Sequence, residues 1–153
     1  MKKIGYSLLI LLLLFIVGGC KSIKDSNDQS NYEENNKTSS NEVIESVKAI
    51  INEKEYIINL ENNETAKSFV NYLPQELTMN ELNGNEKYIY LDRSFPTNSS
   101  NPKHINVGDI MLYGDNCLVI FYKSFDTSYS YTKIGNINNL PNLGNGNIIV
   151  KFE

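Results

Sequence analysis

Histidine, tryptophan and arginine are scarce in this chain of 153 residues, which has one histidine (His104), no tryptophan and one arginine (Arg93). A zinc site built from histidines and a Ser-His-Asp triad would both depend on His104 alone. The sequence also has no G-x-S-x-G segment to hold a catalytic serine. We therefore expect neither a histidine-based metal site nor a serine hydrolase.

Motifs that bind other cofactors are missing as well. Asp109, Asp115 and Asp126 stand next to turns and lack the D-x-D-x-D spacing of a calcium loop. The segment Gly144-Asn145-Gly146 lacks the strand, loop and helix that surround a bound dinucleotide. A turn before the last strand explains it, and we expect no metal and no cofactor.

Positive charge is in short supply. Lys and Arg number 14 against 18 Asp and Glu, a net charge of −4, and removal of Lys2 and Lys3 with a leader leaves 12 against 18, or −6. Binding to phosphate backbones needs a basic stripe. The sequence shows none, so we expect no nucleic-acid partner.

The N-terminus has the pattern of a secretory signal. Lys2 and Lys3 precede an apolar run from Leu8 to Val17, which is too short for the ~20 residues of a transmembrane helix. The segment VGGC ending at Cys20 resembles the lipobox of bacterial lipoproteins, which implies cleavage after residue 19 and lipidation of Cys20. We expect a lipid anchor on the extracytoplasmic face of a bacterial cell membrane. A plain signal peptide that contains a cysteine is the alternative.

The composition divides the chain into a signal peptide (1–19), a lipidated Cys20 with a disordered tether (20–42), and one domain (43–153). The tether is polar and rich in Ser and Asn, so it cannot bury enough surface to fold. A lipidated Cys20 leaves Cys117 without a partner for an intramolecular disulfide. We expect Cys117 to be a buried, inert thiol.

Hydrophobic periodicity predicts strands separated by turns. Alternation in 43–51 and 56–60 predicts a hairpin around Asn52-Glu53, and 77–82, 86–91, 110–113, 118–122 and 148–152 read as further strands. The run 118–122 is apolar on both faces, which indicates a covered strand. One helix is expected over 64–73, with Asn62 or Asn63 as its cap. Many short strands and one or two helices predict a mainly β fold, a closed barrel of about eight strands.

Several segments carry a resemblance to a known family. They are LENNETAKSFVNYLP, LNGNEKYIYL, VGDIMLYGDNCLVIFYKSFDTSYSYTKIGNI and LGNGNIIVKFE. In this order they resemble the bacterial cyclophilin-like domain family over residues 43–153. The resemblance implies a closed cyclophilin-like β-barrel. It implies no particular activity, and no catalytic residue is carried over.

Cyclophilins proper isomerise X-Pro bonds, holding proline in an apolar pocket while an arginine steers the amide nitrogen. Arg93 is the one residue that could take the arginine's part, and the Gln-Gly-Gly-Asp run of true cyclophilins is missing. A solvated Arg93 paired with Asp92 or Glu86 is the simpler interpretation. Prolyl isomerase is the only enzyme that the resemblance supports.

Aromatic residues are concentrated in 121–131, where the chain becomes polar beyond the apolar strand. Tyrosine at the rim of a barrel combines apolar area with a hydroxyl group, which suits a surface that faces a ligand. We hypothesise that Tyr122, Phe125, Tyr129 and Tyr131 line one cleft, with Arg93 near. The alternative is that these rings pack as ordinary barrel residues.

Three functions stay open. The first is a lipid-anchored binding module for a small molecule or an extended peptide, and it is the one we favour. The second is a prolyl isomerase of unusual type. The third is an envelope protein that acts through interactions alone.

Overall fold

The structure is a computed structural model that describes residues 45–153. Eight strands of this part form a closed, antiparallel barrel in the order β1-β10-β3-β4-β7-β6-β9-β2, and β5 and β8 form a separate ribbon. The mainly β barrel and its eight strands are confirmed, with one short helix where one or two were expected. The elements are β1 (Ser46–Ile51), β2 (Lys54–Leu60), α1 (Glu64–Val70), β3 (Gln75–Leu82), β4 (Glu86–Tyr90), β5 (His104–Ile105), β6 (Asp109–Tyr113), β7 (Cys117–Phe121), β8 (Phe125–Asp126), β9 (Thr132–Ile137) and β10 (Ile148–Phe152).

The predicted signal peptide, Cys20, the tether and the start of the domain at Val43 lie outside the described residues. Within 45–153, no helix is long and apolar enough to cross a membrane.

The β1–β2 hairpin turns at Asn52 and Glu53, as predicted. Both residues have positive φ angles, 49° and 66°. Asparagine tolerates this left-handed conformation better than most residues. The turn fixes the register in which Ile51 pairs with Lys54.

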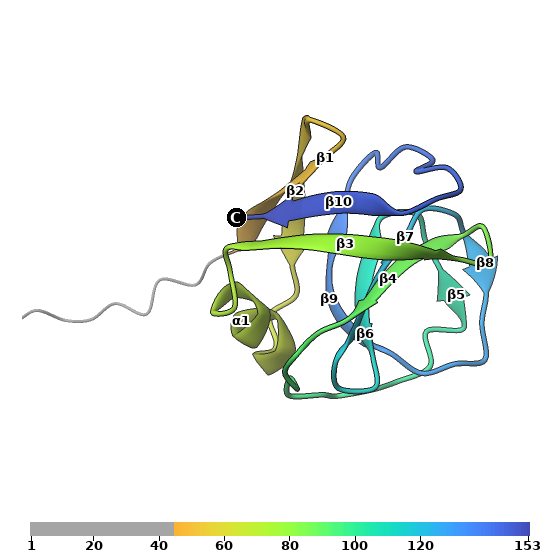
Figure 1. The fold of residues 1–153 in the computed structure, drawn as a ribbon. Helices are drawn as coiled ribbons and strands as arrows, with labels where there is room; N and C mark the ends of the chain where they lie inside the picture. The colour runs from red at the N-terminus through yellow and green to blue at the C-terminus, as the bar shows by residue number, and fades with distance from the viewer. Residues whose placement is uncertain (1–44) are drawn as a thin grey trace, which may run out of the picture. The chain divides into compact units, whose positions relative to one another are not determined.

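Helix α1 covers one end of the barrel, on the left in Figure 1. Asn63 is the N-cap, and its side chain accepts a hydrogen bond from the Ala66 amide at 2.8 Å. The side-chain nitrogen Nδ2 of Asn63 also donates to the backbone carbonyl of Lys133 at 2.8 Å, which ties the helix to β9. The helix ends at Val70 and not at Leu73, because the amides of Tyr72 and Leu73 donate to the carbonyls of Phe69 and Val70, three residues back, as in turns.

The main core fills the barrel. Ile148, Val150 and Phe152 alternate along β10 and are buried, which confirms the predicted inward face of the last strand. The ring of Phe69 from α1 meets that of Phe152 edge to face, with centroids 5.4 Å apart. The helix therefore closes the barrel by completing its core.

A second, smaller cluster lies on the outer face of the barrel. Leu118 and Ile120 of β7 face the main core, while Cys117, Val119 and Phe121 belong to the second cluster. The whole of β7 is buried, as expected for a strand apolar on both faces. The ribbon of β5 and β8, which adds Ile105 and Phe125 to this cluster, lies on the side away from α1 in Figure 1.

Candidate functional site

Five tyrosines gather around the second cluster, and we call their surface the tyrosine face. Tyr90 of β4 and Tyr113 of β6 both pair with Cys117 of β7, so the two rings flank Cys117 on the outer face of the barrel. Tyr88 precedes Tyr90 on the same face of β4. The tyrosine face consists of Tyr88, Tyr90, Tyr113, Tyr129 and Tyr131.

The rings of the tyrosine face contact one another within two groups, a pair on β4 and a trio around Tyr113. Tyr113 lies 6.0 Å from Tyr129 and 5.7 Å from Tyr131, and Tyr88 lies 6.0 Å from Tyr90, measured between ring centroids. Tyr90, Tyr129 and Tyr113 are 64, 61 and 44% exposed. Exposed aromatic rings that are grouped in this way are typical of binding surfaces.

The loop that carries Tyr129 is held in place by backbone hydrogen bonds. Ser100 and Tyr131 exchange two N–H to carbonyl bonds of 2.9 Å, and the Thr127 amide donates to the Lys103 carbonyl at 2.9 Å. Beneath it, Phe121 packs against Phe125 and Tyr131, at centroid distances of 5.7 and 5.5 Å. The tyrosine face is therefore presented on a packed support.

Cys117 lies under the tyrosine face and is 4% exposed. Burial, and then the nearby Glu86 carboxylate, raise the pKa of its thiol to about 11. A thiol with this pKa stays protonated at neutral pH and is a poor nucleophile. The structure agrees with the prediction of a buried, inert cysteine.

Glu86 at the start of β4 is the carboxylate next to this cluster. It is 9% exposed, and its backbone pairs with Phe121 and with Leu82. Burial raises the pKa of Glu86, and the Glu81 carboxylate adds to the rise. Among the described residues, the buried side-chain atom without a hydrogen-bond partner belongs to the neighbouring residue, Asn85, and is its Oδ1.

Of the residues predicted to line a cleft, the structure brings three together. Phe125 and Tyr131 pack on Phe121, and Tyr129 joins them through Tyr113. Whether these rings line a cleft stays a prediction.

Tyr122 and Arg93 make other contacts. Tyr122 is 2% exposed within the main core, and its hydroxyl donates to the Glu81 carboxylate at 2.8 Å. Burial and this hydrogen bond raise the pKa of Tyr122 to about 12. The Arg93 guanidinium lies 5.4 Å from the ring centroids of both Tyr72 and Phe95, and no ion pair with Asp92 or Glu86 is recorded for it in the described chain.

Sequence reasoning missed Tyr88, Tyr90, Tyr113 and Glu86 as members of the site. A signal was present, because 86, 88 and 90 alternate along one strand and therefore share a face. Tyr113 stands one residue before the Gly114 turn, at the place where β6 and β7 meet. The sequence did not supply the register of β4, β7 and β6, which brings these side chains together.

A buried polar cluster inside the barrel was a second possible site. The Lys87 side chain is fully buried; its ammonium group pairs with Glu81 and donates to the carbonyls of Gly144 and Gly146, both at 2.6 Å. Burial raises the pKa of Glu81, but the hydrogen bonds from Lys87 and Tyr122 outweigh it and give a net lowering. All three donors of the ammonium group are used, which makes a structural role the better interpretation.

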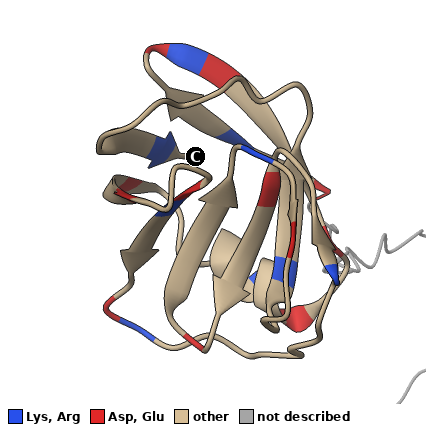
Figure 2. Cartoon of the chain, turned by 90° about the vertical axis from the view of Figure 1, so that its right-hand side faces the viewer, with Lys and Arg blue, Asp and Glu red and all other residues tan. Residues whose placement is uncertain are grey.

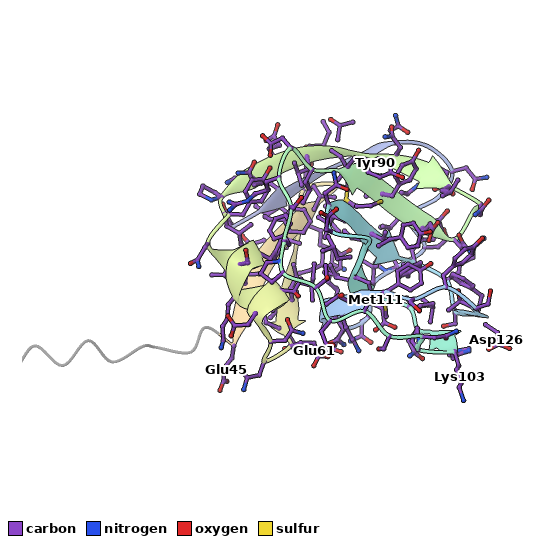
Figure 3. The ribbon with its side chains drawn as sticks, turned by 90° about the horizontal axis from the view of Figure 1, so that it is seen from below. Glu45, Glu61, Tyr90, Lys103, Met111 and Asp126 are labelled. Atoms are coloured by element: carbon purple, nitrogen blue, oxygen red, sulfur yellow. The ribbon has the colours of Figure 1, made fainter. Side chains whose placement is uncertain are left out.

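The remaining charged residues are dispersed. Figure 2 shows basic and acidic residues scattered along the ribbon of the described residues, without a continuous basic stripe. His104 and Asp126 form an exposed pair at 2.7 Å, next to Lys103 at the end of the domain opposite Glu45 and Glu61 (Figure 3). In residues 45–153, no three His, Cys, Asp or Glu side chains are placed to hold a metal ion.

The chain matches a protein-family model over most of its described residues. The sequence model of the cyclophilin-like family matches residues 49–153, which is nearly all of the described domain. No curated protein and no solved structure matches the chain.

Proposed function

Because the chain belongs to the cyclophilin-like family, we propose that its barrel is a binding module that takes a small molecule or an extended peptide on the tyrosine face. The observation that carries this proposal is the exposure of Tyr90, Tyr113 and Tyr129, between 44 and 64%, on one side of a closed barrel. Water-exposed rings that are held rigid lose little entropy when a ligand covers them.

The support beneath the rings favours binding over a purely structural role. The core cluster under the tyrosine face is already complete without Tyr90 and Tyr129, which are its most exposed neighbours. Exposed tyrosines combine apolar area with hydroxyl groups, so they suit a ligand that has both apolar and polar parts.

A prolyl isomerase is a second candidate, supported by one contact. The Arg93 guanidinium lies beside Phe95 and Tyr72, so an arginine does stand next to aromatic rings. Catalysis of X-Pro exchange that is lost in Arg93→Ala, with the fold intact, would support this candidate. Exchange at the uncatalysed rate would exclude it.

We also propose that the module is anchored by a lipid on Cys20 at the outer face of a bacterial cell membrane. The basic start, the short apolar run and the small residues before Cys20 support this proposal. In this setting the ligand would be an extracytoplasmic molecule. The alternative is an envelope protein that acts through a protein partner. Recovery of such a partner by crosslinking would support this alternative.

The proposal is tested by a screen of small molecules and short peptides against 15N-labelled protein. Ligands should shift the amide resonances of Tyr90, Tyr113 and Tyr129. Exposed Ile149 on β10, which is 57% exposed, and Ile57 on β2 serve as internal controls from other strands. Shifts that gather around these isoleucines instead of the tyrosines would show that the binding surface lies elsewhere.

A further inference from the structure

We infer that Asn145 is a site of spontaneous deamidation, and that conversion there disturbs the contacts of the buried Lys87 ammonium group. In this reaction the backbone nitrogen of Gly146 bonds to the side-chain carbon Cγ of Asn145, and the proton that the nitrogen loses departs with the leaving ammonia. Water then opens the resulting succinimide ring and leaves aspartate or isoaspartate at position 145. The reaction needs no ligand and is independent of the tyrosine face.

The chain has two Asn-Gly pairs, Asn83-Gly84 and Asn145-Gly146. Glycine has no side chain to obstruct attack by its own backbone nitrogen, so the ring closes most easily at such pairs. Both asparagines are exposed, and exposure therefore does not distinguish them. The hydrogen bonds of the two glycine amides do.

The first pair, Asn83-Gly84, is held in a hydrogen-bonded turn between β3 and β4. Asn83 and Gly84 have φ angles of 54° and 70°, the left-handed conformation of a two-residue hairpin turn. The Gly84 amide donates to Glu81 Oε1 at 2.7 Å, and the Asn85 amide donates to the Leu82 carbonyl at 3.3 Å. The nitrogen that would attack Asn83 is engaged, so this turn has to open before the ring can close.

The second pair, Asn145-Gly146, lacks this protection. It lies outside the strands, in the loop that precedes β10. In the part of the chain that the structure describes, the Gly146 nitrogen donates no hydrogen bond to another residue. A Cβ atom added at Gly146 would have no heavy atom within 4 Å. The attacking nitrogen is therefore available, and the ring has room for the water molecule that opens it.

Conversion at position 145 changes the spacing of two acceptors of Lys87. The carbonyls of Gly144 and Gly146, on either side of Asn145, accept hydrogen bonds of 2.6 Å from the Lys87 ammonium group. In isoaspartate the main chain passes through the side-chain Cβ, which adds one carbon to the backbone between these carbonyls. The Lys87 side chain is fully buried, so a donor that loses its acceptor stays unsatisfied. Isoaspartate at position 145 should therefore destabilise the barrel.

The rates of conversion test the site. The full chain is incubated in mildly alkaline buffer, folded and, in parallel, unfolded in guanidinium chloride, and peptide mapping by mass spectrometry follows each pair. In the folded protein Asn145 should convert at least about tenfold faster than Asn83, because a hydrogen-bonded turn reacts only when it opens. In denaturant the two rates should be similar. Equal rates in the folded protein, faster conversion at Asn83, or the same ratio in denaturant would overturn the inference.

The effect on Lys87 is tested with Asn145→Gln and, as a matched control, Asn83→Gln. Glutamine would have to form a larger ring and reacts much more slowly. Each protein is compared with itself before and after incubation, and the converted fraction, which has gained a negative charge, is isolated by anion exchange. The midpoint of urea denaturation should fall for the native protein and for Asn83→Gln, and stay constant for Asn145→Gln. Conversion at Asn145 with an unchanged midpoint would refute the effect on Lys87.

Discussion

Lys87 and Glu81 form an ion pair inside the barrel, in which the Lys87 side chain is fully buried and the Glu81 side chain is 18% exposed. The pair connects β4 to β3, and the bonds from Lys87 to Gly144 and Gly146 extend it to the chain that precedes β10. The hydroxyl of Tyr122 completes the cluster by donating to Glu81. Three parts of the fold are thus held by one ammonium group.

This cluster predicts a large cost for Glu81→Gln. The substitution leaves the Lys87 ammonium buried without its counter-charge, and breaking a buried pair in this way costs about 3–5 kcal/mol of the free energy of unfolding. Glu55→Gln is the control, because the pair of Glu55 with Lys48 at 3.4 Å is exposed and should contribute less than about 1 kcal/mol. Urea denaturation measures both. Equal costs for the two variants would show that the buried pair does not stabilise the barrel.

Much of the fold could be predicted from the sequence because its signals are local. The alternation of Ile148, Val150 and Phe152 and the Asn52-Glu53 turn depend on neighbouring residues only. The ribbon of β5 and β8 was not predicted, since its strands have two residues each and their pairing joins segments twenty residues apart. Strands this short carry no periodicity.

The candidate site was predicted only in part, for the same reason. Phe125, Tyr129 and Tyr131 were expected at the rim because the chain becomes polar there, and they do lie together with Tyr113. Tyr122 was grouped with them on sequence proximity. A strand turns successive side chains to opposite faces, so Tyr122 faces the core while Phe121 faces the outer cluster.

Phe69→Ala should destabilise the domain strongly. The ring is fully buried and meets Phe152 edge to face, so its removal leaves a cavity between α1 and the barrel. We expect a loss of about 3–5 kcal/mol in the free energy of unfolding. Ile57→Ala, at a side chain that is 50% exposed, should cost less than about 1 kcal/mol. A small effect of Phe69→Ala in chemical denaturation would contradict the role of α1 in the core.

The pH dependence of stability should reveal Glu86. Its pKa is raised above the ordinary 4.5, so it stabilises the folded state below about pH 4.5, and this contribution is lost as the pH rises through the raised pKa. Glu86→Gln cannot ionise and keeps the contribution. The melting temperature of the variant relative to the native protein should therefore increase as the pH rises above about 4.5.

The other titrating groups near Glu86 do not disturb this comparison. The pKa of Glu81 is lowered, so the stability that Glu81 contributes is lost as the pH falls. This loss is the same in the native protein and in Glu86→Gln. Burial raises the pKa of Cys117 to about 11, the pKa of Tyr122 to about 12 and the pKa of Tyr131 above its ordinary 10, so all three stay protonated in this range. A difference in melting temperature that does not change with pH would show that Glu86 is not the group responsible.

Cys20→Ala tests the proposed lipid anchor. The acyl chains supply about 0.8 kcal/mol for each buried CH₂ group, so their loss should release the protein to the medium or leave its leader uncleaved. Fractionation of cells and mass spectrometry of the N-terminus follow the two outcomes. Cys117→Ala is the matched control and should stay in the membrane fraction. A Cys20→Ala protein that remains processed and membrane-bound would refute the anchor.

Replacement by alanine should destabilise the domain much more at Tyr131 than at Tyr129. Tyr131 is 7% exposed and packs on Phe121, so Tyr131→Ala should cost about 3 kcal/mol of the free energy of unfolding. Tyr129 is 61% exposed, and its recorded ring contact is with Tyr113, so Tyr129→Ala should change the stability by less than about 1 kcal/mol.

Ligand binding is best tested at Tyr129, because its exposed ring can be removed without disturbing the fold. A ligand found in the screen should bind Tyr129→Ala about tenfold more weakly, which is typical of an aromatic residue at the centre of an interface. Ile149→Ala removes an exposed apolar side chain from β10 and should bind as the native protein does. If Tyr129→Ala unfolds, the ring belongs to the structural core; if it binds unchanged, the ligand does not cover Tyr129.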